Sequence, residues 1–263
     1  MTEHFGEDAP LTTLEEFKTW IVREDDDFLV LNKPGWLVCH PSKNGPMSSL
    51  VGAARVYLND APNVHLVSRL DRETSGLVVL AKHKKAASLS QKAIEDKKVS
   101  KKYLAIMRGK MEGLYTVSQP LAEDKTSRVV VKQACAVDRG SAKSAVTIFR
   151  PLRYSDKLTP LCLCEVQIIT GRKHQIRAHA KWLEHEIVGD KIYGPDDNIY
   201  LRFIESGLSS QDLELLLMPR QALHAYELDF TKVIPNMRLR AKPPADFEEF
   251  MLKYGLGDCS EFA

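Results

Sequence analysis

A polar loop with several ionisable side chains lies directly before the apolar run Leu77–Ala81. The loop contains Arg69, Asp71, Arg72 and Glu73. Catalytic groups often lie on loops that a rigid sheet holds in place. A carboxylate between two arginines is biased toward its ionised form, which a nucleophile or a general base requires. A surface ion pair would produce the same pattern, and the local pattern alone favours that simpler interpretation.

A second segment with possible ligand contacts is Thr170-Gly-Arg-Lys-His-Gln-Ile-Arg177. The Thr-Gly break separates a strand-like stretch from a helical one and places Arg172 and Lys173 in the first turn of the expected helix. Backbone N–H groups at a helix N-terminus attract anions, so phosphate contact is one interpretation. Simple initiation of a helix, with the basic side chains exposed to solvent, explains the pattern at least as well. Arg177 follows Ile176 on this helix and could turn inward to meet a carboxylate.

The segment from Lys82 to Lys102 is unusually basic. It holds eight lysines against Glu95 and Asp96, a local balance of +6 in a chain whose formal net charge is +2. These lysines are Lys82, Lys84, Lys85, Lys92, Lys97, Lys98, Lys101 and Lys102. Tyr103 follows at once, and a lysine-rich face beside an aromatic ring suits an RNA backbone and a stacked base. A solvated helix face with a core tyrosine is the common alternative.

The elements that would position these residues follow from apolar patterning. Short apolar or β-branched runs predict strands at 28–31, 77–81, 103–107, 128–137, 143–149, 161–169 and 223–230. Helical spacing predicts helices at 86–94, 174–183, 213–217 and 245–254, the third after a capping box from Ser209 to Asp212. Consecutive strands with interspersed helices favour an α+β fold over a strictly alternating one. Regular structure is expected to begin near Trp20.

Composition excludes several functional classes. The chain has 263 residues, of which 44% are hydrophobic and 27% charged, as expected for a globular protein. The N-terminus has no apolar core, and no apolar run is long enough for a transmembrane helix. The five cysteines show no Cys-x-x-Cys spacing, so neither a disulfide framework nor a zinc site is expected, and the cytoplasm is the simplest location. Glycine-rich nucleotide motifs and His-Glu-x-x-His are also missing, which argues against nucleotide cofactors and metals.

Taken together, these segments resemble the RluA family of pseudouridine synthases over about Val22 to Phe247. The resemblance depends on several motifs in a shared order: Asn32-Lys-Pro-Gly35 with His40-Pro41, Arg69-Leu-Asp71 with Thr74-Ser-Gly-Leu77, Lys101-Lys-Tyr-Leu-Ala105, Thr170–Arg177, Ile187-Val-Gly-Asp190 with Tyr193-Gly194, and Arg220–Ala225. It implies a mixed, largely antiparallel central sheet flanked by helices. It also implies that the target uridine of a structured RNA, either tRNA or rRNA, is flipped out of its stack.

The resemblance also assigns roles to residues. Asp71 would be the catalytic carboxylate, acting either as a nucleophile or as a base. Arg177 would pair with Asp71, and Tyr103 would stack on the uracil and assist proton transfer. The remaining residues expected to contact RNA are Arg69, Arg72, Lys101, Lys102, Arg172, Lys173 and His174. Arg69 would help to displace the flipped base. No cofactor or metal is expected, because base and sugar already hold all the atoms exchanged.

The chain departs from the family pattern in two places. Ser68 stands where the family usually has His before Arg-Leu-Asp. Only about 20 residues precede the catalytic pattern, too few for the RNA-binding S4 domain of many relatives. We therefore expect a loosely attached arm at 1–20, a stand-alone catalytic domain at 21–254 and a tail at 255–263, with residues 195–219 as an insertion. A monomer is the simplest assembly.

Two other functional classes stay open at this point. One is a non-catalytic RNA-binding or assembly factor of the same fold, against which the intact Arg69-Leu-Asp71 argues. The other is a nucleoside hydrolase, since that reaction also needs a carboxylate at the anomeric carbon. A metal-binding aspartate cluster would favour a hydrolase, and Asp25-Asp-Asp27 is a poor candidate for one.

Overall fold

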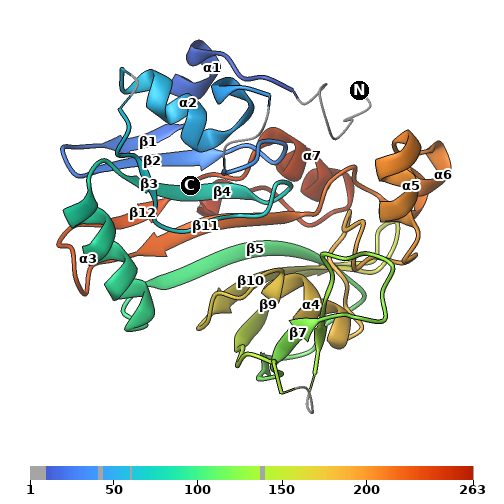
Figure 1. Ribbon diagram of the computed structural model, residues 1–263. Coiled ribbons are helices and arrows are strands. Elements are labelled where there is room, and N and C mark those ends of the chain that lie inside the picture. Colours follow the sequence, from blue (N-terminus) through green and yellow to red (C-terminus); the bar gives the residue numbers. More distant parts are fainter. Residues whose placement is uncertain (1–9, 41–43, 60, 137–139, 263) are drawn as a thin grey trace. The chain divides into compact units, whose positions relative to one another are not determined.

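The computed structural model describes residues 10–40, 44–59, 61–136 and 140–262 (Figure 1). The chain divides into two compact units, each built from segments far apart in the sequence. Unit 1 contains the described residues up to Val99, together with Ala225–Pro244 and Phe262, and unit 2 contains Ser100–His224 and Ala245–Glu261. Because the chain passes repeatedly from one unit to the other, no single shift in composition could mark a boundary between them.

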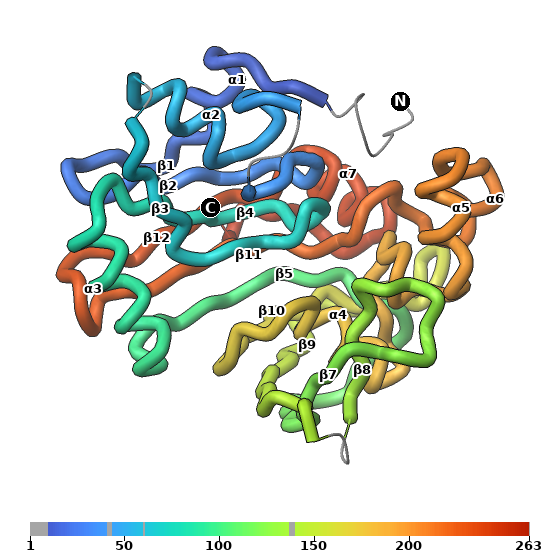
Figure 2. The backbone as a smooth tube through the Cα atoms, in the orientation of Figure 1, coloured from blue at the N-terminus to red at the C-terminus, as the bar shows by residue number. Residues whose placement is uncertain are grey.

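Unit 1 is a small sheet with helices. Its elements are α1 Leu14–Thr19, β1 Ile21–Glu24, β2 Phe28–Lys33, η1 Pro46–Ser48, α2 Leu50–Tyr57, β3 His65–Leu66, β4 Ser75–Ala81, α3 Lys84–Glu95, β11 Leu223–Asp229, which begins two residues before the unit boundary, and β12 Arg238–Arg240. The strands follow the order β1-β2-β4-β11, β12 pairs with β11, and β3 pairs with β4. Figure 2 traces the backbone from β4 directly into α3.

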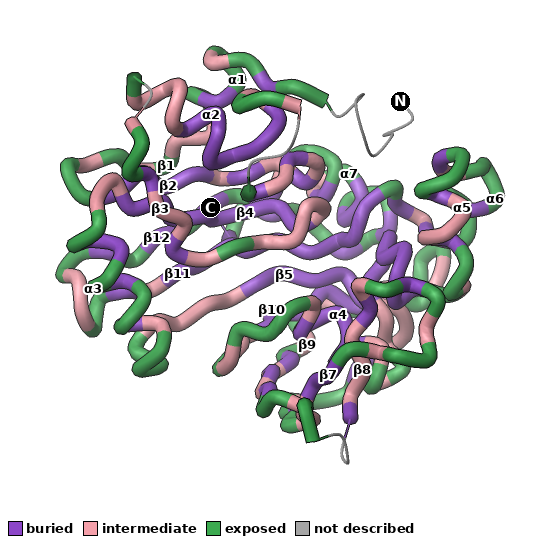
Figure 3. Tube along the Cα trace, viewed as in Figure 1, coloured by how far each residue is buried: buried purple, intermediate pink, exposed green. Residues whose placement is uncertain are grey.

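The central strand β4 is buried along its whole length, as Figure 3 shows. Its side chains alternate between two core clusters. Leu77, Val79 and Ala81 belong to the cluster that α3 and β12 cover, and Val78 and Leu80 belong to the cluster around α1 and α2. A strand covered on both faces reads as an unbroken apolar run. This explains the sequence Leu-Val-Val-Leu-Ala and gives the preceding loop a rigid base.

Unit 2 contains a second group of antiparallel strands and the remaining helices. Its elements are β5 Ser100–Arg108, β6 Tyr115–Val117, β7 Leu121–Glu123, β8 Gln133–Cys135, β9 Thr147–Ser155, β10 Leu161–Ile168, α4 Gln175–Trp182, α5 Ile199–Ser206, α6 Ser210–Leu216, α7 Ala245–Lys253 and η2 Ser260–Phe262, whose last residue belongs to unit 1. The strands follow the order β5-β10-β9-β6, and β7 pairs with β8 in a separate ladder. Tyr103 on β5 pairs with Val166 on β10.

The expected fold class is confirmed: the protein is α+β, with a mixed, mostly antiparallel sheet and flanking helices. The long apolar runs at 28–31, 77–81, 103–107, 161–169 and 223–230 are strands, each within a few residues of the expected ends. The helices expected at 86–94, 174–183, 213–217 and 245–254 are α3, α4, α6 and α7, and Ser209 and Asp212 form the expected capping box.

Two expected strands are wrong in extent. Of the stretch 128–137, the described residues 128–136 contribute only β8, and β9 begins at Thr147 rather than at residue 143. Asp124 accepts hydrogen bonds from the backbone and hydroxyl of Thr126, and Ser127 accepts one from the backbone of Val129. Such local side-chain bonds compete with a strand ladder and turn the chain instead. Of the turn expected at 138–140, residues 138 and 139 lie outside the described residues.

The expected loose arm is wrong for residues 12–20, while residues 1–9 lie outside the described part of the chain. Helix α1 is closed by a capping box between Thr13 and Glu16, and Phe17 is fully buried in the core of unit 1. The Thr-x-x-Glu spacing from Thr13 to Glu16 is the sequence signal for this helix. Helices α2 and α5 were also missed. In the part of the chain that the structure describes, no helix has the length and apolarity that a membrane span requires.

Candidate active site

The loop that carries Asp71 leads straight into the buried strand β4. The carbonyl oxygen of Asp71 accepts a hydrogen bond from the backbone N–H of Thr74 at 3.1 Å, which closes a tight turn. Gly76 follows in a left-handed conformation with φ +114°, and a Cβ there would lie 2.3 Å from the carbonyl oxygen of Ala225. Only glycine fits such a position without strain. Gly76 therefore allows the second residue of β4 to lie against the backbone of β11, close behind the turn that carries Asp71.

Lys33 anchors this loop from the C-terminal side of Asp71. Its side chain is completely buried, and its Nζ donates to the carbonyl oxygens of Pro34, Leu37 and Arg72 at 2.7, 2.9 and 2.8 Å. A buried ammonium is tolerated only when its donors are satisfied. The Asn-Lys-Pro-Gly motif thus fastens the end of β2 to the residue that follows Asp71.

Cys39 holds the residue on the other side of Asp71. Its buried Sγ donates to the carbonyl oxygen of Leu70 and accepts from the N–H of Leu70, both at 3.4 Å. The backbone is therefore held one residue before and one residue after Asp71. We call this pair of contacts, made by Lys33 and Cys39, the Asp71 clamp. The clamp could not be predicted, because nothing in the sequence spacing brings residues 33–39 to residues 70–72.

Arg177 turns inward from α4, as predicted, and meets the carboxylate of Asp190. Its Nε and Nη2 donate to Oδ2 and Oδ1 at 2.6 and 2.8 Å, and both side chains are buried. Burial alone would raise the pKa of Asp190, but the Arg177 guanidinium and the N–H groups of Ile192 and Tyr193 lower it overall. The pairing of Arg177 with Asp71 stays a prediction.

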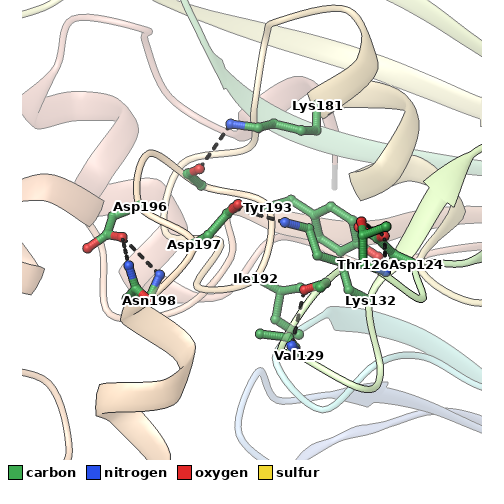
Figure 4. A network of polar contacts seen from close by, with 12 residues as sticks. Asp124, Thr126, Val129, Lys132, Lys181, Ile192, Tyr193, Asp196, Asp197 and Asn198 are labelled. Atoms are coloured by element: carbon green, nitrogen blue, oxygen red, sulfur yellow. Dashed lines mark hydrogen bonds and ion pairs between the residues drawn. The ribbon is translucent and has the colours of Figure 1, made fainter.

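Tyr193 connects this ion pair to the neighbouring loops of unit 2. Its hydroxyl accepts from the N–H of Gln133 at 2.7 Å and lies 3.1 Å from Nδ1 of His174. The guanidinium of Arg177 lies 5.1 Å from the centre of its ring. Lys132 approaches the same ring and binds Asp197 at 2.8 Å (Figure 4). His174, expected to contact RNA, therefore also supports the Arg177 site.

The prediction that Arg172 and Lys173 lie in the first turn of a helix is wrong, because both residues precede α4. Helix α4 begins at Gln175, and His174 before it has a left-handed backbone with φ 54°. The side-chain oxygen of Gln175 accepts from the hydroxyl of Thr170 and from the N–H of Arg172, at 2.8 and 3.0 Å. These bonds hold the chain in a turn, so Arg172 and Lys173 are exposed on a loop rather than in the first helical turn.

The segment of β5 that contains Tyr103 carries two of the expected RNA contacts. Tyr103 is buried, and Lys101 lies on the same side of the strand, two residues away. Burial lowers the pKa of Lys101 to about 8. Lys102 points the other way and pairs with Glu165 at 3.1 Å. Lys101 is thus a lysine whose charge changes near neutral pH.

The expected site residues are distributed over both units. Arg69, Asp71 and Arg72 belong to unit 1, and Tyr103, Arg177 and the remaining expected RNA contacts belong to unit 2. Within unit 2, a further buried arginine was missed as an anchor: Arg220 pairs with Asp246 of α7 at 2.5 and 2.8 Å. Among the described residues, no group of three or more His, Cys, Asp or Glu side chains is arranged to hold a metal ion.

Comparison with known proteins supports the resemblance. Residues 27–182 match the family model described as RNA pseudouridylate synthase. The chain is 32% identical over 252 residues to ribosomal large subunit pseudouridine synthase D of Vibrio parahaemolyticus, covering 91% of this chain and 74% of that protein. It is 35% identical over 180 residues to an uncharacterized RNA pseudouridine synthase of Mycoplasma pneumoniae, covering 68% of this chain and 56% of that protein.

A solved structure agrees with this result. The protein described as human RNA pseudouridylate synthase domain containing 4 matches with a TM-score of 0.68 and 26% identity, over 92% of this chain and 95% of that one. The chain therefore belongs to the RNA pseudouridine synthase family, a family of isomerases, and its RluA-type character is confirmed.

Proposed function

We propose that this protein isomerises a specific uridine of a tRNA or rRNA to pseudouridine, with Asp71 as the catalytic carboxylate. The observation that carries the proposal is the Asp71 clamp. It fixes the backbone on both sides of one carboxylate, at the base of a doubly buried strand, within the motif that matches the family. Catalytic groups need such preorganisation, because small displacements of a reacting group cost large factors in rate.

The reaction rearranges one nucleoside without adding or removing atoms. The bond between the ribose C1′ and the uracil N1 breaks, the base turns, and C5 bonds to C1′. The C5 proton is lost, and N1 gains a proton in its place. Asp71 serves this sequence either by attacking the nucleoside or by abstracting a proton from it, and both roles require the ionised carboxylate.

The other site residues have supporting roles in this proposal. Tyr103 stacks on the uracil and assists proton transfer, and Arg177 keeps Asp71 ionised. Arg69 helps to displace the flipped base, since the base must leave its stack before it can react. Arg72, Lys101, Lys102, Arg172, Lys173, His174 and the lysines from Lys82 onward contact the RNA. The five cysteines are free thiols, which fits a reducing compartment, most simply the cytoplasm.

The decisive experiment compares Asp71→Asn with Asp156→Asn, a matched change of an exposed aspartate on unit 2. Asp71→Asn should abolish pseudouridine formation, measured by carbodiimide treatment and primer extension on cellular RNA, while RNA binding survives. Asp156→Asn should retain full activity. Undiminished turnover in Asp71→Asn would exclude Asp71 as the catalytic group.

The same assay separates the two alternatives. If the protein is a non-catalytic assembly factor, the RNA of a deletion strain will carry the same pseudouridines as the wild type. If it is a nucleoside hydrolase, purified protein will release free uracil from RNA. The family match argues against both outcomes.

A further inference from the structure

The short ladder of β7 and β8 packs on the rest of unit 2 through a core cluster that contains Tyr193. The two strands pair with each other in a separate sheet rather than with the main one. Leu121 of β7 and Val129 of the loop before β8 lie in this cluster with Ala178 of α4 and Tyr193. Tyr193 is one of the bulkiest buried side chains among the described residues. Side-chain packing, rather than pairing with the main sheet, therefore positions the ladder.

The hydroxyl of Tyr193 bonds to the backbone of this ladder. It accepts a hydrogen bond from the N–H of Gln133, the first residue of β8, at 2.7 Å. It also lies 3.1 Å from Nδ1 of His174, which directly precedes α4 in a left-handed conformation. A tyrosine hydroxyl can accept from one partner and donate to another. One oxygen atom thus connects β8 to the start of the helix that carries Arg177.

The ring of Tyr193 lies beside the buried ion pair of Arg177 with Asp190. The guanidinium carbon of Arg177 is 5.1 Å from the ring centre, within the range of a cation–π contact. Nζ of Lys132, the residue before β8, is 5.9 Å from the same centre (Figure 4). The backbone N–H of Tyr193 donates to Oδ1 of Asp190 at 3.0 Å. Tyr193 therefore contacts both members of the ion pair.

The two parts of this side chain have different neighbours. The hydroxyl faces β8 and His174, whereas the ring faces the guanidinium of Arg177. A planar guanidinium that stacks on an aromatic ring keeps fewer orientations than one held by a carboxylate alone. Loss of the ring should therefore loosen Arg177, and loss of the hydroxyl alone should loosen β8.

We propose that Tyr193 is a positioning residue for the reaction. Its ring orients the guanidinium of Arg177, and its hydroxyl ties β8 to the same point of unit 2. This inference rests on the proposed function, in which Arg177 keeps Asp71 ionised. It goes further, because it assigns an effect on the reaction rate to a buried side chain that has no expected contact with RNA.

Two substitutions in the full-length protein separate the ring from the hydroxyl. Tyr193→Phe removes only the hydroxyl, and Tyr193→Met removes both parts while filling most of the volume. Tyr154→Phe and Tyr154→Met are the matched controls, because Tyr154 is an exposed tyrosine on β9 of the same unit. We would measure kcat and KM for pseudouridine formation at a temperature at which circular dichroism shows each protein folded. The exchange rate of the Gln133 amide hydrogen would be measured by NMR.

Tyr193→Met should lower kcat about tenfold or more, because a displacement of about 1 Å can cost about 100-fold in rate. Its KM should change by less than about twofold, since the residues that bind RNA are intact. Tyr193→Phe should keep kcat within about twofold of the wild type, because the ring remains. In the same variant the Gln133 amide should exchange about fivefold faster, because its acceptor is lost. The Tyr154 variants should match the wild type in all of these quantities.

Wild-type kcat in Tyr193→Met, or an equal fall of kcat in Tyr193→Phe, would overturn the role of the ring. Unchanged exchange at Gln133 in Tyr193→Phe would overturn the role of the hydroxyl. If Tyr193→Met does not fold, Tyr193→Phe decides alone: retained kcat with faster exchange at Gln133 supports the proposal, and any other combination contradicts it. Failure of the proposed function would show separately, as a wild-type protein that forms no pseudouridine.

Discussion

Replacing Lys33 by Met is the sharpest test of how the fold positions Asp71. Met fills a volume similar to that of the lysine stem but has no donor. The carbonyl oxygens of Pro34, Leu37 and Arg72 would each lose the bond from Nζ. A buried polar group left without its partner costs about 1–3 kcal/mol. Removing the buried charge recovers part of that loss.

We therefore expect Lys33→Met to lower the free energy of unfolding by about 2–4 kcal/mol, measured by urea denaturation. Loss of the bond to Arg72 also frees the backbone beside Asp71. Since a displacement of about 1 Å can cost about 100-fold in rate, kcat for pseudouridine formation should fall about 10- to 100-fold in the folded variant. KM should change far less, because the RNA contacts remain.

The matched control is Lys18→Met, which removes an exposed lysine from α1 in the same unit. It should leave both stability and kcat unchanged. If Lys33→Met unfolds at the same urea concentration as the wild type, the three bonds do not stabilise the fold. If its kcat is unchanged while it is destabilised, Lys33 supports the core without positioning Asp71, and the catalytic part of the reasoning is refuted.

Three further perturbations test other parts of the site. Asp190→Asn removes the bidentate carboxylate partner of the buried Arg177 and should cost about 3–5 kcal/mol of unfolding free energy. The pKa of Asp190 is lowered in the folded state, so the ionised carboxylate contributes to the free energy of unfolding above the unfolded pKa of about 4, and this contribution is lost as pH falls. The free energy of unfolding should therefore decrease less steeply with falling pH in the variant than in the wild type. The same steepness in both proteins would contradict this prediction. Gly76→Ala places a methyl group against the backbone of β11 and should destabilise unit 1 by more than about 1 kcal/mol, whereas Gly140→Ala, in open space, should be neutral in the same thermal melts. Lys101 has a pKa of about 8, so RNA affinity should fall as pH rises from 7 to 9; Lys101→Gln should remove that dependence, and a persisting dependence would assign it to another group.

The elements that could be predicted from the sequence are those whose apolar pattern follows directly from which of their faces are buried. Strand β4 is apolar throughout because both of its faces are covered, and an apolar run of this kind can be recognised in the sequence alone. The motif around Asp71 could also be recognised, because its residues are adjacent in the chain. Helix α2 could not be predicted, since it contains Gly52, and glycine is disfavoured in helices. The structure explains this glycine, because the carbonyl oxygen of Pro46 lies where a Cβ would be.

The partners of the site residues were much harder to predict. Arg177 was expected to meet a carboxylate, but Asp190 is one of many, and only the fold brings the two together. The sequence around Lys33 predicts a surface lysine in a turn, yet its side chain is fully buried and donates hydrogen bonds to carbonyl groups of residues 34, 37 and 72. Long-range hydrogen bonds of this kind leave no spacing signal in a single sequence.

Strand β4 connects the Asp71 loop to helix α3 through the core of unit 1. The Asp71 loop precedes its first residue, and α3 begins three residues after its last, Ala81. Both faces of the strand are packed, so neither end can shift without disturbing the core. The position of the Asp71 loop relative to α3 is therefore fixed by the fold. Changes at Asp71 and at the exposed lysines of α3 should then act independently on RNA binding, and a variant combining Asp71→Asn with Lys84→Gln and Lys85→Gln should lose RNA affinity by the same factor as the lysine variant alone.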